Sequence, residues 1–76
     1  PRWLTVAHPD IVRVDASGRP MVHGSRQHAS HCHPRFREES RRITRAMAGH
    51  FAKNPHVIGW QTDNEINCHF SEDYSE

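Results

Sequence analysis

The strongest constraint on the fold of this sequence is one helical stretch followed by one strand-like run. Residues 34–53 have the apolar periodicity of an amphipathic helix, and the proline at position 34 suits a first helical turn, where its missing N–H is no loss. Pro55 lies just beyond this helix, and a short run of strand character over 57–62 follows it. Helix, short turn and buried-type strand form half of an α/β repeat. Because one helix and one strand cannot close a sheet, we expect an α/β fold whose remaining strands lie outside these residues.

The length and composition also indicate an incomplete fold. The sequence has 76 residues, of which 34% are hydrophobic. A lone core in a chain of this size rarely supplies more than ~3–5 kcal/mol of stability. Two cysteines are too few for a disulfide scaffold. The chain begins at Pro1 and ends in an acidic tract, and we expect it to be a fragment of a larger domain.

The charge balance excludes some classes of partner. Ten Lys and Arg residues stand against nine Asp and Glu residues, a formal net charge of +1. The arginine-rich face of the predicted helix has glutamates mixed in, which is typical of a solvated face rather than a nucleic-acid interface. No apolar run reaches the ~18 residues of a membrane span, and no signal peptide is visible. We expect no nucleic acid, no membrane and, with two reduced thiols, a cytoplasmic location.

Residues 1–33 are predicted to be mostly loop. Trp3 could anchor a turn, and the chain breaks at His8, because a residue before proline is pushed out of the helical region. A short β-branched run begins at Ile11 and stops at a turn signal that ends in Gly18. With residues 19–24 it would form a small hairpin at best.

Polar residues follow directly on the predicted strand, where α/β folds collect their functional groups. These are Asp63, Asn64 and Glu65. An amide that holds a sugar hydroxyl, next to a carboxyl that keeps its proton through partial burial, is what a glycosidase acid/base requires. Taken alone, Asn-Glu is a weak two-residue match, and a polar turn after a strand is the better explanation of it.

The wider sequence resembles the family 42 glycoside hydrolases, the β-galactosidases. The stretch from Asn54 to Glu65, which ends in Trp-Gln-Thr-Asp-Asn-Glu, resembles the fourth barrel strand of that family. The helix is similar to its third barrel helix, and residues 1–33 are similar to the long loop after its third strand. The matching segments are Pro1-Arg2-Trp3-Leu4, Pro9-Asp10-Ile11, Val14-Asp15, Gly18, His23-Gly24-Ser25-Arg26, Pro34 and Phe36-Arg37-Glu38.

The resemblance implies a fold and a division of the chain. The fold is a fragment of a (β/α)₈ TIM barrel, which takes about 250 residues when complete. Residues 1–33 would be an active-site loop region and residues 34–53 a helix. Residues 56–65 would be a strand that ends in the acid/base, and residues 66–76 the start of the next loop.

The resemblance also implies a reaction and site residues. It implies a retaining enzyme that cleaves terminal β-D-galactosyl residues from a β-galactoside substrate, in which Glu65 is the general acid/base. Asn64 and Arg26 match residues that bind the galactose hydroxyls. The nucleophile would be a glutamate on the seventh strand, outside this sequence, since Glu72, Asp73 and Glu76 follow too closely on the same connection. The fragment alone would be inactive, and the full-length protein would be a homotrimer, as relatives often are.

Two tryptophans have open roles. Trp60 lies in the middle of the predicted strand, and we expect it to pack between strand and helix rather than to line a sugar-stacking wall. Trp3 lies in a loop on the active-site side by analogy, so either a binding or a packing role fits it.

Histidines and cysteines raise the question of zinc. Cys32 and Cys68 each have histidines nearby, and four N or S ligands would make a closed structural site. Some members of the similar family hold a structural zinc through one loop cysteine and three cysteines after the acid/base. Here Ser30 takes the position of the loop cysteine, and the downstream cysteine cluster is missing. We expect no cofactor and no bound zinc, with Cys32 and Cys68 as the residual candidates.

Two alternative functions remain open from the residues. Another glycosidase of the same barrel clan would share Asn-Glu but act on a different sugar, and a panel of nitrophenyl glycosides discriminates it. A small His-rich metal-binding or interaction module would instead fold alone on binding zinc, which circular dichroism detects.

Overall fold

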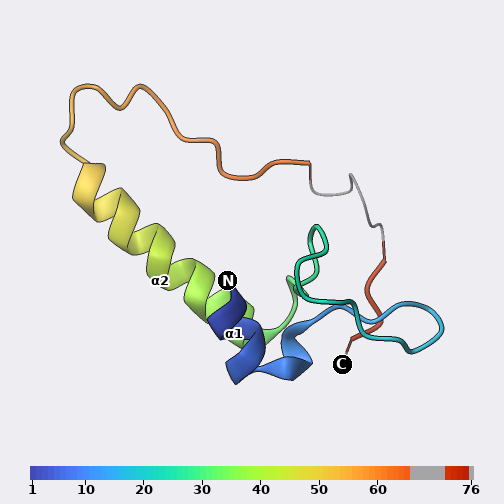
Figure 1. Cartoon of the computed structure of the whole chain (residues 1–76). Coiled ribbons are helices and arrows are strands. Elements are labelled where there is room, and N and C mark those ends of the chain that lie inside the picture. The colour runs from blue at the N-terminus through green and yellow to red at the C-terminus, as the bar shows by residue number, and fades with distance from the viewer. Residues whose placement is uncertain (66–71, 76) are drawn as a thin grey trace.

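The computed structural model describes residues 1–65 and 72–75. It contains an α-helix α1 at Arg2–Ala7, a 3₁₀ helix η1 at Pro9–Ile11 and a long α-helix α2 at Pro34–Phe51. The short helices and the loop up to residue 33 gather near the start of α2, and the chain after α2 returns along an extended path (Figure 1). None of the helices in the described part of the chain is long and apolar enough to span a membrane.

The first residues form a helix rather than the predicted turn. Pro1 occupies the N-cap of α1, and the backbone N–H of His8 closes the helix on the carbonyl of Leu4. Leu4 is the buried residue of this helix, so burial of its side chain supports a helix too short to be stable by propensity alone. The predicted break at His8 is confirmed, because this residue has φ −135° and ψ 79° before Pro9.

An extended segment at residues 11–15 organises the rest of the loop region. Val12 pairs with Ala29 and Val14 pairs with Pro20, both as isolated antiparallel bridges. The predicted hairpin is thus reduced to a single bridge. Its turn forms as predicted, since Asp15 accepts hydrogen bonds from the N–H groups of Ser17 and Arg19 at 2.8 and 3.0 Å. The hydroxyl of Ser17 and the amide of Arg19 lower the pKa of Asp15 to about 2.

The core of the chain is small. Leu4, Ile11 and Val12 are buried, and Phe36 from the first turn of α2 packs against them. The chain has a radius of gyration of 14.7 Å, whereas a closed domain of this length has about 11 Å. This core therefore fixes the position of the start of α2 and does not extend along the rest of the helix.

Helix α2 begins at the predicted residue, and its N-cap shows why. The Nδ1 atom of His33 accepts the N–H of Arg35 at 3.2 Å. In the neutral ring the proton then lies on Nε2, which is 3.2 Å from the carboxylate of Asp10. This hydrogen bond lowers the pKa of Asp10. His33 thus caps α2 and ties it to η1.

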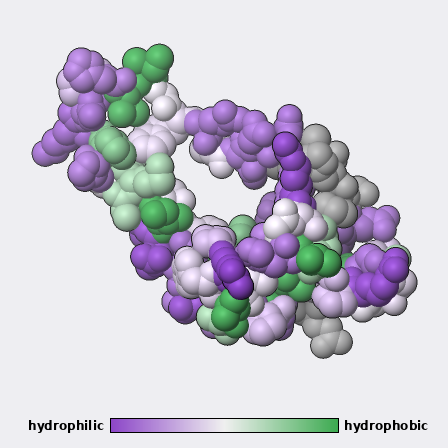
Figure 2. All heavy atoms as spheres, in the orientation of Figure 1, coloured by the Kyte–Doolittle hydropathy of each residue, from purple (hydrophilic) through white to green (hydrophobic). Residues whose placement is uncertain are grey.

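The two faces of α2 differ as the periodicity predicts. Arg35 forms ion pairs with Glu38 and Glu39, and Arg42 pairs with Glu39 at 2.7 Å. The apolar stripe of the helix consists of Phe36, Ile43, Met47 and Phe51. On this stripe, Ile43 and Met47 remain 52% and 46% exposed. Figure 2 shows hydrophobic side chains exposed along this helix. The arginine face is solvated and mixed in charge, and the stripe is only partly covered by the described residues.

The strand predicted at residues 56–65 is not formed. These residues have no strand assignment and all of them are exposed. Ile58, in the middle of the run, is fully exposed. A strand needs a neighbour to accept its backbone hydrogen bonds and a layer to cover its side chains. Because the described residues provide no neighbouring strand here, no strand forms in this chain, and the strand of a complete barrel stays a prediction.

Candidate functional site

The turn that carries Arg26 lies against the residues that follow the predicted strand. The side-chain amide of Gln27 donates from Nε2 to the carbonyl oxygen of Glu65 at 2.8 Å. The two residues are 38 positions apart in sequence. This hydrogen bond brings together the segments of two of the predicted site residues, Arg26 and Glu65. Both of these residues are exposed.

Tight turns shape the segment that presents Arg26. The N–H of Ser25 donates to the carbonyl of Val22 at 3.2 Å, and Gly24 has φ 95°, a value that favours glycine. The ring of His28 lies 3.0 Å from the carbonyl of Ser25 through Nδ1. These contacts hold the segment on both sides of Arg26, so a local hydrogen-bond network fixes its backbone.

The hydroxyl of Thr5 links this turn to helix α1. It lies 3.0 Å from Nδ1 of His23 and 3.4 Å from Nε2 of His28. The two rings meet edge to face, with centroids 5.0 Å apart. His23 and His28 therefore have structural partners in the turn, which explains part of the histidine density without a metal.

The side chains around Asn64 are ordered by a second glutamine. Gln61 donates from Nε2 to the side-chain oxygen of Asn64 at 2.8 Å and to the carbonyl of Asp63 at 3.0 Å. The N–H of Asn64 in turn donates to the carboxylate of Asp63 at 2.7 Å. Because its oxygen accepts this hydrogen bond, the NH₂ group of Asn64 is the part of the side chain that can donate to a sugar hydroxyl.

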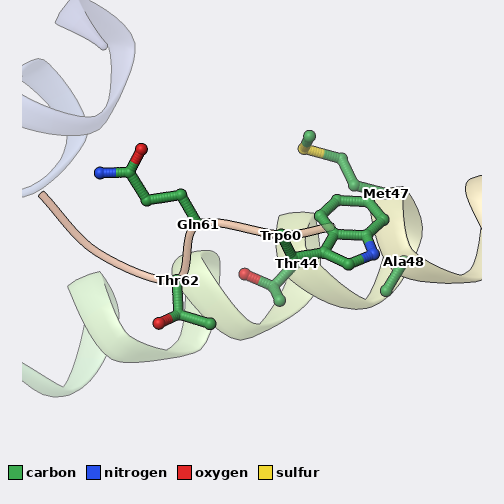
Figure 3. A pocket seen from close by; sticks show the side chains of 6 residues that line it. All are labelled: Thr44, Met47, Ala48, Trp60, Gln61 and Thr62. Atoms are coloured by element: carbon green, nitrogen blue, oxygen red, sulfur yellow. The ribbon is translucent and has the colours of Figure 1, made fainter. Parts of the chain in front are cut away.

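Trp60 lies against helix α2. It lines a pocket of about 390 Å³ together with Met47 and Ala48 of the helix, and Thr44, Gln61 and Thr62 complete the lining. Figure 3 shows the indole beside these helix residues. This placement agrees with packing between the helix and the following segment, although the side chain remains 53% exposed. Trp3 lies elsewhere, beside Phe36 and Ile43 in a second pocket.

Two hydrogen bonds, here called the Ser30–Asp73 clasp, join the loop region to residues 72–75. The hydroxyl of the buried Ser30 hydrogen-bonds to the carboxylate of Asp73, and the N–H of Tyr74 donates to the carbonyl of Val14 at 3.0 Å. Burial works to raise the pKa of Asp73, but hydrogen bonds from Ser30, Ser75 and Val14 together lower it. The segment at 72–75 is therefore fixed against the loop that carries Arg26.

The donor set at this clasp does not fit zinc. Ser30 stands at the position where the resemblance places a cysteine ligand, and its hydroxyl is engaged with a carboxylate. Cys32 is exposed and unbonded to another cysteine. Among residues 1–65 and 72–75, no three His, Cys, Asp or Glu side chains gather to hold a metal. Cys68, the other candidate, lies outside the described residues, so the expectation of no bound zinc stays a prediction.

Sequence reasoning missed two contributors to this site. The sequence does not single out Gln27, because a lone glutamine in a loop carries no periodic or spacing signal. The position of Asp73 in the sequence excludes it as the nucleophile, and in the structure its carboxylate holds a chain segment. The sole sequence signal for both is their position: Gln27 follows Arg26, and Asp73 lies shortly after Glu65.

The Ser30–Asp73 clasp predicts a coupled effect on stability. In the full-length protein, Ser30→Ala removes a buried hydrogen bond to a charged group, at a cost of about 1–3 kcal/mol. The lowered pKa of Asp73 means that the folded state binds its proton less well than the unfolded state. The contribution is therefore present above the ordinary carboxyl pKa and is lost as the pH falls through the lowered value.

A double-mutant cycle measures this coupling. Thermal unfolding at pH 7 should show that Ser30→Ala and Asp73→Asn together cost less than the sum of the single variants. The difference should shrink on acidification. Strict additivity at pH 7 would mean that the two side chains do not stabilise each other.

Comparison with known proteins gives the same family over the whole chain. The profile of glycoside hydrolase family 42, described as "Beta-galactosidase", matches residues 1–76. β-Galactosidase YesZ of Bacillus licheniformis is 49% identical over 72 residues, covering 95% of this chain and 11% of that protein. β-Galactosidase BgaH of Haloferax lucentense is 44% identical over 69 residues, 91% of this chain and 10% of that protein. β-Galactosidase BbgII of Bifidobacterium bifidum is 41% identical over 76 residues, all of this chain and 11% of that protein. The chain thus spans about a tenth of the length of these relatives. It belongs to the family 42 glycoside hydrolases.

Proposed function

We propose that this chain is a segment of a retaining β-galactosidase and that it carries the general acid/base, Glu65. The observation that carries the proposal is the contact between Gln27 and Glu65, which brings the Arg26 turn beside the Asn64-Glu65 pair. Family membership supports the substrate class, since the relatives named above are β-galactosidases. Asn64 and Arg26 are proposed to bind galactose hydroxyls.

The proposed residues divide the reaction between them. In the first step Glu65 gives its proton to the glycosidic oxygen, while a carboxylate outside this chain attacks the anomeric carbon and the aglycone leaves as an alcohol. In the second step Glu65 takes a proton from water, whose oxygen displaces the enzyme carboxylate and releases galactose. Arg26 supplies a fixed fork of N–H donors, which suits a pair of sugar hydroxyls.

The chain is proposed to provide the loop after the third strand, the third helix and the fourth strand of a (β/α)₈ barrel. Ile43 and Met47 on the apolar stripe of α2 and Trp60 in the segment 56–65 are about half exposed here. A complete barrel would cover these side chains. The segment alone is proposed to be inactive, because a retaining enzyme needs two carboxyl groups about 5–5.5 Å apart. We also propose a homotrimeric full-length protein, a cytoplasmic location and no bound zinc.

The substrate proposal is tested on the full-length protein with a panel of p-nitrophenyl glycosides. The β-D-galactoside should be hydrolysed with the largest kcat/KM of the panel, and the first product detected by NMR should be β-galactose, as retention requires. A larger kcat/KM on the β-glucoside or β-mannoside would assign the site to another sugar. Initial formation of α-galactose would exclude the retaining mechanism.

The barrel proposal predicts which face of α2 tolerates substitution. In the full-length protein Ile43→Ser should lower the free energy of unfolding by about 2–5 kcal/mol, because it would empty a site packed against the barrel. Arg45→Ser, on the charged face of the same helix, should change it by less than about 0.5 kcal/mol. Thermal unfolding of the two variants measures the contrast, and equal small effects would mean that the stripe stays uncovered.

A further inference from the structure

The side chain of Gln27 contacts the backbone of Glu65 across 38 positions of the sequence. Its Nε2 donates to the Glu65 carbonyl at 2.8 Å, while its Oε1 is buried without a hydrogen-bond partner among the described residues. A buried amide oxygen without a partner costs free energy. The amide is nonetheless held in this position, because the donor on its other side reaches the carbonyl of Glu65.

The backbone on both sides of this hydrogen bond is unusual. Gln27 has φ 53° and Glu65 has φ 49°, and no other described residue besides glycine has a positive φ. The left-handed conformation costs a residue with a Cβ roughly 1–2 kcal/mol. Such conformations persist where surrounding contacts determine them, and they gather at functional sites. At Glu65 the conformation decides where the side chain leaves the main chain.

From these contacts we infer that Gln27 is a positioning residue for the acid/base. It holds the main chain of Glu65 in the left-handed conformation and so sets the direction of the Glu65 carboxyl toward the glycosidic oxygen. The inference rests on the proposed function of Glu65. Gln27 touches the backbone of Glu65 rather than the substrate, so its effect on the reaction is expected to act on proton transfer alone.

A leaving-group comparison in the full-length enzyme tests this role. Gln27→Met keeps the length of the side chain and the Cβ at the positive φ but removes the donor. It should lower kcat/KM about tenfold on a galactoside with a poor leaving group, such as methyl β-D-galactoside, where protonation limits the rate. On 2,4-dinitrophenyl β-D-galactoside, whose leaving group needs no proton, kcat/KM should change less than twofold.

A donor-retaining variant and an acid/base variant separate the explanations. Gln27→Arg keeps an N–H donor at similar reach and should restore kcat/KM on the poor leaving group to within about threefold of the parent value. An equal loss of kcat/KM on both substrates in Gln27→Met, or no loss on either, would overturn the inference. If Glu65→Gln itself shows no dependence on the leaving group, the proposed function fails instead. Thermal unfolding of each variant identifies losses caused by misfolding.

Discussion

Glu65→Gln in the full-length protein is expected to lower kcat/KM on galactosides with poor leaving groups by about 10²–10⁴-fold. Glutamine keeps the shape of the side chain but has no proton to give to the glycosidic oxygen. On 2,4-dinitrophenyl β-D-galactoside kcat/KM should stay nearly unchanged, because this aglycone departs without protonation. The turnover number kcat on the same substrate should fall, since the second step has lost its general base.

Azide provides the second measurement for this prediction. A small anion needs no general base, so azide should raise kcat of Glu65→Gln on the dinitrophenyl substrate and yield β-galactosyl azide. Glu72→Gln is the matched control: Glu72 is an exposed carboxylate close in sequence, and the hydroxyl of Tyr74 donates to it at 2.9 Å. Normal turnover of Glu65→Gln on methyl β-D-galactoside would remove the acid/base role from Glu65.

The sequence predicted local structure well where the determinants are local. Helix α2 begins at the predicted residue and ends within two residues of the prediction, because its capping side chain, its proline and its apolar period all lie in the helix or directly before it. The turn after Asp15 depends on the carboxylate and the N–H groups within four residues of it. The sequence does not predict helix α1, because burial of Leu4 with Ile11 and Val12 supports this helix rather than the neighbours of Leu4 in sequence.

Residues 56–65 show that an apolar sequence pattern is not enough to form a strand. The apolar residues among them, such as Val57 and Ile58, favour a strand, but a strand forms only with hydrogen-bonding neighbours and a covering layer. The chain of 76 residues supplies the pattern and not the neighbours. The same reason leaves the apolar stripe of α2 exposed. In a barrel both surfaces would be covered by elements that this sequence does not contain.

The site was predicted through resemblance, and its internal contacts were not. Resemblance indicated Glu65, Asn64 and Arg26 as site residues, but not what holds their segments together. The side chain of Gln27 hydrogen-bonds to Glu65, which lies 38 positions further along the sequence. The side chain of Ser30 likewise hydrogen-bonds to the distant Asp73. Contacts between distant loop residues depend on how the turns close in space. No period, spacing or composition along the sequence encodes them.

Arg26 is expected to affect every galactoside alike. If its guanidinium binds galactose hydroxyls, the contact exists for any aglycone, so Arg26→Ala should lower kcat/KM on methyl and dinitrophenyl β-D-galactosides by the same factor. Two hydrogen bonds from a charged donor are worth about 3–4 kcal/mol together, which predicts a loss of roughly 10²–10³-fold. This pattern is the opposite of the one expected for Glu65 and Gln27, whose effects depend on the leaving group.

Arg26→Lys separates the charge of this residue from its geometry. Lysine keeps the positive charge but presents a single ammonium in place of a planar fork, so it cannot hold two hydroxyls in a fixed plane. We expect it to recover less than about tenfold of the loss measured for Arg26→Ala on both substrates. Full recovery by lysine would mean that Arg26 acts through its charge rather than through paired hydrogen bonds. A loss confined to the poor leaving group would place Arg26 with the acid/base, and the assignment of galactose binding to this turn would then be wrong.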